Sequence, residues 1–176
     1  MHMNGTYTFL LARLIHVVCG VAWAGALVFV AVVLLPAIQG AGPAGGGVMD
    51  QIIRVRRLPV LMMTLAILTV LSGLSLFYLD VHAFGAAWVH TGTGRTFSLG
   101  AALAILGMIV GMSVSTPAAR KLGALGASIK ASGAPPSLEQ AATLGRLQNR
   151  LVVAGKVVTV LIVLAVACMG VARYIP

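Results

Sequence analysis

The stretch FLLARLIHVVCGVAWAGALVFVAVVLLPAI, at residues 9–38, decides the fold of this chain. Arg13 and His16 are its only basic side chains, and it contains no acidic one. A hydrocarbon core of about 30 Å is crossed by about 20 residues of α-helix, so the stretch predicts a membrane-spanning helix with length to spare. An ionisable residue inside a span is costly and by default indicates a functional position facing the protein interior. His16 is therefore the first candidate site residue.

The composition of the whole chain agrees with a membrane protein. Of its 176 residues, 60% are hydrophobic and only 9% are charged, whereas a soluble domain has roughly 25% charged residues. The net charge of +9 is concentrated in two loops, where membrane topology accounts for it. We therefore expect the lipid bilayer as the environment of this protein, and we expect no nucleic-acid partner.

Apolar runs and helix breakers predict an all-α, polytopic membrane protein with a single four-helix transmembrane domain over residues 1–176. Pro36 with the GAGPAGGG stretch is expected to end the first helix, and Pro117 to kink or stop the third. Ser137 and Gln140 have the spacing of a capping box, which predicts that a helix begins there. This last helix is expected to start with a cytoplasmic amphipathic segment. The expected helices cover about residues 9–36, 58–79, 97–116 and 138–172.

The distribution of basic residues predicts the orientation of the bundle. The loop between the second and third helices has only Arg95, offset by Asp80. The other two loops hold the remaining loop cations, which are Arg54, Arg56, Arg57, Arg120, Lys121, Lys130, Arg146 and Arg150. Because basic loops stay in the cytoplasm, both termini are expected on the outer, periplasmic side of a bacterial inner membrane, which the chain crosses several times.

Small residues recur along the third predicted helix at spacings of three and four. They are Gly100, Ala104, Gly107, Gly111 and Ser115. Such a stripe lets a neighbouring helix backbone approach closely, so we expect it to be a helix-packing seam. The partner is expected to be a helix of this chain, another membrane subunit or a second copy of the chain.

Several chemistry-bearing residues are expected at one depth near the outer surface. In the spans these are His16, Cys19, Cys168 and Met169, and in the outer loop His82 and His90, with Arg13 and Arg173 at the rim. An imidazole with soft sulfur donors suits copper, and one or two imidazoles suit haem iron. The alternative is structural: a histidine within a span can hydrogen-bond a neighbouring helix, and cysteine and methionine pack well in apolar cores.

Three segments resemble the copper-resistance protein D family and related four-helix membrane proteins. They are HVVCGVAWAG at residues 16–25, RVRRLPVLMMTLAILTVLSGL at 54–74 and TGTGRTFSLG at 91–100. The resemblance implies copper passage from the outer side through His16, His82 and His90. This chain has Gly100 where that family often has a lysine early in the third helix.

The first helix is also similar to that of the four-helix, haem-binding protoporphyrinogen oxidase, which carries a histidine and a tryptophan seven residues later. His16 and Trp23 match this pattern, but Pro36 is followed by Ala37 where that enzyme usually has a Pro-Arg pair. Three hypotheses follow: a bundle that binds haem b or copper at His16, a cofactor-free accessory subunit of a larger membrane complex, and an oxidase of this porphyrin type. No catalytic residue is indicated by the sequence, and a non-enzymatic role is favoured.

Overall fold

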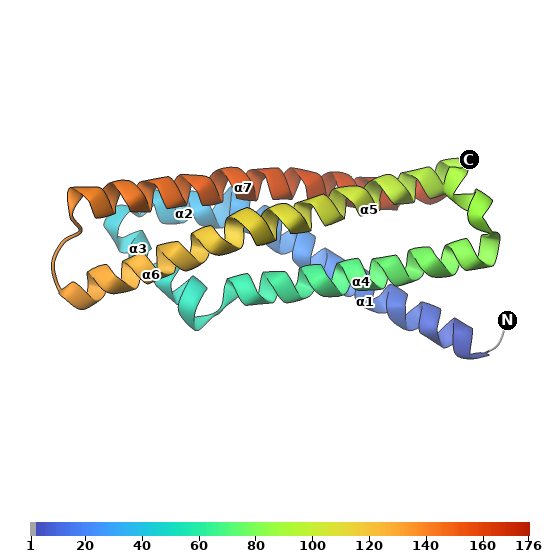
Figure 1. Ribbon diagram of the computed structural model, residues 1–176, viewed down its shortest axis with the longest axis horizontal. Helices are drawn as coiled ribbons and strands as arrows, with labels where there is room; N and C mark the ends of the chain where they lie inside the picture. The colour runs from blue at the N-terminus through green and yellow to red at the C-terminus, as the bar shows by residue number, and fades with distance from the viewer. Residues whose placement is uncertain (1–2) are drawn as a thin grey trace.

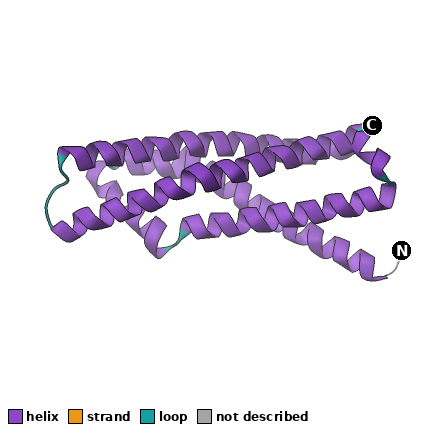
Figure 2. Cartoon of the chain, in the orientation of Figure 1, coloured by secondary structure: helices purple, strands orange, loops and turns teal. Residues whose placement is uncertain are grey.

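Four helical rods lie side by side in the computed structural model, which describes residues 3–176 and the side chains of all of them except residues 3–5 and 43 (Figure 1). Figure 2 shows helices joined by short loops, and no strand, over these described residues. All four rods are long and apolar enough to span a membrane. The expectation of an all-α protein with four helices that are long and apolar enough to span a membrane is confirmed.

The rods have the following bounds. The first consists of α1 (Met3–Phe29), a π-helical segment (Val30–Leu34) and α2 (Leu35–Gly40). A 3₁₀ turn (Gly42–Ala44), α3 (Gly45–Asp50) and a π-helical segment (Gln51–Val55) lead to the second rod, α4 (Leu58–Phe84). After a 3₁₀ turn (Ala86–His90), the third rod consists of α5 (Gly92–Val110), a π-helical segment (Gly111–Ser115) and α6 (Thr116–Ser132). The fourth is α7 (Leu138–Val171), which ends in a 3₁₀ turn (Ala172–Tyr174).

The bundle is assembled from two helix pairs, with α1 packed along α4 and α5 packed along α7. The pairs meet in a buried layer at mid-length, made of Trp23, Ala66, Ala104, Val158 and Ile162. Trp23 is only 4% exposed and is the one large aromatic side chain in this layer. Many large apolar side chains elsewhere on the rods are exposed, as expected of surfaces that face lipid rather than water.

The two ends of the bundle differ in what they hold. Both termini and the α4–α5 connection lie at one end, here called the terminal end, while α3 and the α6–α7 connection lie at the other, the hairpin end (Figure 1). The third rod contains 41 residues and is therefore about 60 Å long, about twice the thickness of a hydrocarbon core. The α6–α7 hairpin is thus long enough to extend beyond a membrane at the hairpin end.

Two prolines that were expected to end or bend helices lie inside continuous rods. The first rod passes Pro36 and ends only at Gly40, and the third passes Pro117 and continues to Ser132. In both cases a π-helical segment directly precedes the turn that holds the proline. A wider turn accommodates a residue that lacks an N–H and crowds the preceding carbonyl. At the second site Thr116 also donates its hydroxyl to the Gly111 carbonyl at 3.2 Å.

Other boundaries differ from expectation in ways that matter for the site. The helix expected over 58–79 continues to Phe84, so Asp80 and His82 belong to α4 rather than to a loop. It ends at Gly85, whose φ of 84° is a conformation that favours glycine. The third rod begins at Gly92 rather than at residue 97, because the Thr91 hydroxyl caps it by accepting from the Gly94 N–H. The capping box of Ser137 and Gln140 is present as expected.

The small-residue stripe divides into two parts. A Cβ on Gly100 would lie 3.2 Å from the Ala165 carbonyl oxygen, and one on Gly107 would lie 3.0 Å from Cδ1 of Ile162. The half of the stripe nearer the terminal end is therefore a close contact between α5 and α7 of the same chain. Gly111 differs, because a Cβ there would meet nothing within 4 Å. Ser115 lines a cavity, which is described below.

Candidate functional site

A cavity of about 450 Å³ lies between the rods in the half of the bundle nearer the terminal end. We call it the histidine cavity, and its walls include apolar side chains such as Val17, Phe77, Phe97, Ile105 and Val166. Its volume falls within the range of about 300–1,000 Å³ that is typical of small-molecule sites. The polar or charged side chains that line it are His16, Arg13, Thr69, Asp80, Arg173 and the indoles of Trp23 and Trp88.

His16 is held by α4 in one defined orientation. Its Nδ1 lies 2.8 Å from the backbone carbonyl oxygen of Thr69. A carbonyl can only accept a hydrogen bond, so Nδ1 carries the proton and donates it. The Ser72 hydroxyl donates to the same oxygen at 3.1 Å. Gly73 makes room for the ring, since a Cβ there would lie 2.7 Å from Cε1 of His16.

This hydrogen bond decides what the other ring nitrogen of His16 can do. In the neutral ring that donates through Nδ1, Nε2 has a lone pair. Within the described part of the chain, Nε2 has no hydrogen-bond partner. Histidines that bind metals characteristically donate their other ring N–H to a backbone carbonyl or carboxylate, which fixes the tautomer and orients the ring. His16 has this arrangement on the wall of a cavity.

Three charged residues lie around the histidine cavity toward the terminal end. Arg13 comes from α1, Asp80 from α4 and Arg173 from the last turn of the chain. The Asp80 carboxylate interacts electrostatically with Arg173 and with Arg13. Neither arginine forms an ion pair at contact distance with the Asp80 carboxylate. Among the described residues the only ion pair is that of Asp50 and Arg54. The rim therefore has two guanidinium groups for one carboxylate, a net charge that suits an anionic group.

Aromatic side chains cluster beside the cavity at the terminal end. Trp88, which lines it, stacks on Phe97 at 6.3 Å between ring centroids and on Phe84 at 6.4 Å. Phe77 contacts the Trp88 ring edge-on at 5.5 Å. Gly94 allows this arrangement, because a Cβ there would collide with the Trp88 carbonyl. Such a cluster limits the access of water to the cavity.

Only some of the expected ligands come together. Met169 of α7 lines the same cavity as His16. Cys19 and Cys168 do not line it, and Cβ of Cys168 instead lies against Gly100 in the α5–α7 contact. Among the residues that the structure describes, no group of three or more histidine, cysteine, aspartate and glutamate side chains could hold a metal ion.

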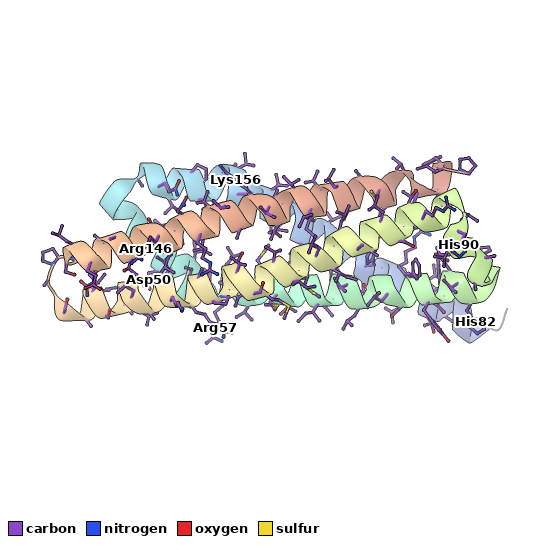
Figure 3. The ribbon with its side chains drawn as sticks, turned by 45° about the horizontal axis from the view of Figure 1, so that its top comes forward. Asp50, Arg57, His82, His90, Arg146 and Lys156 are labelled. Atoms are coloured by element: carbon purple, nitrogen blue, oxygen red, sulfur yellow. The ribbon has the colours of Figure 1, made fainter. Side chains whose placement is uncertain are left out.

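The two outer histidines also lie away from the cavity. His82 and His90 are both exposed at the terminal end, and neither lines the histidine cavity (Figure 3). The His82 ring contacts the Tyr78 ring, at 6.0 Å between centroids. The structure therefore brings neither of them to His16 as a second ligand.

Thr69, Gly73 and Asp80 are site residues that the sequence analysis did not single out. Along α4 they recur with Leu76 at spacings of four, three and four, which puts them on one face of a helix. This signal was available in the sequence, but it is visible only if the helix is extended beyond residue 79. The shorter predicted helix left Asp80 in a loop.

Comparison with protein-family models, curated proteins and solved structures found no match to this chain. The class of the protein therefore follows from its fold alone. Four helices of sufficient length and apolarity make it a multi-pass membrane protein. The resemblance to the copper-resistance protein D family stays a prediction.

Proposed function

We propose that this protein is an integral membrane haem protein in which Nε2 of His16 is an axial ligand of haem b. The observation that carries the proposal is the hydrogen bond from Nδ1 to the Thr69 carbonyl. It leaves Nε2 as a free donor of electrons on the wall of a largely apolar cavity of about 450 Å³. A single histidine suffices to hold haem iron on the protein side, as in globins and peroxidases.

The other groups around the cavity suit the remaining parts of haem b. Its macrocycle is large and apolar, as are the walls formed by Val17, Ile105 and Val166. Its two propionates are carboxylates, and guanidinium groups are the preferred partners of carboxylates. Arg13 and Arg173 would hold them at the rim. Met169, which lines the same cavity as His16, would be a second residue able to hold the haem iron, through a thioether of the kind known from cytochromes c.

Bound haem would supply one-electron chemistry, and the residues of the chain would bind and orient it and limit its contact with water. The bond to Thr69 makes the imidazole of His16 a stronger donor and prevents its rotation. The aromatic cluster around Trp88 covers the cavity toward the terminal end. No catalytic residue is proposed.

The donor set favours haem over copper as the bound group. Copper sites in proteins are built from several imidazole, thiolate or thioether ligands. The histidine cavity offers one imidazole and one thioether, from His16 and Met169, while both cysteines lie outside it. Copper at His16 therefore remains the second candidate, supported by the thioether of Met169 alone.

The absorption spectrum of the protein purified from haem-replete membranes tests the proposal. We expect a Soret band, a haem b signature after extraction into alkaline pyridine, and one haem per chain. Elemental analysis of the same sample should find iron and little copper. Copper without a Soret band would favour the second candidate. A colourless, copper-free protein would contradict both and support an accessory subunit, while oxidation of protoporphyrinogen by the haem-loaded protein would indicate the porphyrin-pathway enzyme.

We also propose that the terminal end faces the periplasm, with the protein in the inner membrane of a bacterium. Arg57 and Arg146 lie toward the hairpin end (Figure 3). The other loop cations except Arg95 belong to the segments that lead to this end or to their immediate neighbours, and basic loops are retained in the cytoplasm. A topology reporter inserted after Ala134, in the α6–α7 turn, should read as cytoplasmic. A reporter joined after Gly92 should read as periplasmic. A cytoplasmic signal at Gly92 would reverse the orientation.

A further inference from the structure

A second cavity, of about 190 Å³, lies on the hairpin side of Trp23. Five of the eight methionines of the chain line it, so we call it the methionine cavity; they are Met49, Met62, Met63, Met108 and Met112. Each π-helical segment of the described chain also contributes to its wall, for example through Val30, Ile52 and Ser115. Interruptions of this kind in α-helices are frequently found at functional sites.

Two hydrogen-bond donors of this cavity have no partner. The Ser115 hydroxyl forms no hydrogen bond to another group of the described chain. Every other serine and threonine hydroxyl from Thr64 to Thr159 does form one. Thr116 takes the Gly111 carbonyl, the acceptor four residues before Ser115. The indole N–H of Trp23 also has no hydrogen-bond partner among the described residues; the residue is 4% exposed, but no unpaired side-chain nitrogen or oxygen of the described chain is fully shielded, so both donors are open to their surroundings. A donor without a partner is costly outside water, so these two donors on residues that line one apolar cavity are available to an acceptor that occupies it.

The size of the cavity restricts the ligand. An apolar cavity of about 150 Å³ in another protein binds benzene, so about 190 Å³ accommodates one six-membered ring with small substituents. The wall also extends to the lipid-facing surface, since Met112 lines the cavity and is 45% exposed. A ligand dissolved in the membrane can therefore contact the cavity from the side.

We propose that the methionine cavity binds the ring of a membrane-soluble quinone. The carbonyl oxygens of the ring would accept hydrogen bonds from the Ser115 hydroxyl and the Trp23 indole N–H. The flexible, polarisable methionine side chains adapt to substituents on such a ring. The proposal concerns binding only and does not depend on haem in the histidine cavity.

Quenching of Trp23 fluorescence by duroquinone, a single-ring quinone, tests this site. The chain has two tryptophans, so Trp88→Phe leaves Trp23 as the only reporter. We expect saturable quenching in detergent-solubilised protein. Ser115→Ala should weaken binding about fivefold, as expected for the loss of one hydrogen bond. The matched control is Ser113→Ala, on the same helix, because that hydroxyl already donates to the Ile109 carbonyl at 2.7 Å and is exposed; it should leave binding unchanged.

Two further arms separate the site from nonspecific partitioning. Gly111→Leu should abolish saturable quenching, because its side chain fills the cavity without meeting a neighbour at Cβ. Durene, which has the same methylated ring without carbonyls, should compete poorly with duroquinone. The titration is repeated with His16→Ala combined with Trp88→Phe. This variant should contain no haem that could quench Trp23, so the titration then reports on the methionine cavity independently of the proposed haem site. Unsaturable quenching, retention of quenching in Gly111→Leu, equal competition by durene, or equal effects of the two serine variants would each overturn the proposal.

Discussion

His16→Ala is expected to abolish haem binding, leaving the purified protein with less than about a tenth of the wild-type haem per chain. The reason is that the proposed site has one imidazole, and loss of an axial ligand removes the iron–protein bond. The fold should survive, because the apolar length of the first rod is unchanged and the Thr69 carbonyl can still share the Ser72 hydroxyl proton with its shorter partner, the Leu68 carbonyl. Haem content is measured from the pyridine spectrum, and folding from a single size-exclusion peak with an unchanged midpoint of thermal unfolding.

Two controls make this result specific for ligation. His82→Ala removes an exposed imidazole at the same end of the bundle and should retain full haem content. His16→Gln is the decisive variant, because its amide can donate to the Thr69 carbonyl while offering no imidazole nitrogen. We expect it to be nearly as empty as His16→Ala. A fully loaded His16→Gln protein would show that the residue only joins α1 to α4.

Gly100→Leu is expected to lower the thermal stability of the bundle by several degrees or to prevent its assembly. A Cβ at this position would lie 3.2 Å from the Ala165 carbonyl oxygen and 3.3 Å from Cβ of Cys168. Because a backbone oxygen cannot rotate away, a leucine there must force α5 and α7 apart. Overpacking of a well-packed contact typically costs about 1–3 kcal/mol. Size-exclusion chromatography of heated, detergent-solubilised protein measures the loss.

The matched control is Gly111→Leu, three helical turns further along the same rod. It introduces the same side chain, but its Cβ would meet nothing within 4 Å. We expect it to remain as stable as the wild type. Equal loss of stability in the two variants would mean that leucine is harmful anywhere along this helix, and that close contact at Gly100 is not the cause.

The sequence predicts the spans well because each depends only on the length of an apolar run. It also predicts His16 as a candidate, because a basic side chain in such a run is unusual. Its partner Thr69 lies 53 residues away on α4. That contact depends on how α1 and α4 are aligned, which no local pattern specifies. The same limit applies to Gly100 and Gly111, which have the same spacing signal but different surroundings.

Two other expectations that the structure changes concern prolines, whose effect on a helix depends on the turn that precedes them. Pro36 was expected to end the first rod and Pro117 to kink or stop the third, but neither proline ends its rod, and a π-helical turn precedes each of them. This compensation depends on backbone geometry rather than on residue type. The separation of Cys19 and Cys168 from the histidine cavity was also beyond prediction, since equal depth in a membrane does not specify which face of a helix a residue occupies.

The layer around Trp23 has a consequence for the electrical properties of the membrane. The indole lines both cavities, and it is packed in one buried apolar cluster with Ala66, Ala104, Val158 and Ile162. A hydrated ion that entered from one end would meet this apolar cluster at mid-length, where dehydration is very costly. A membrane containing the protein in this conformation should therefore maintain its potential.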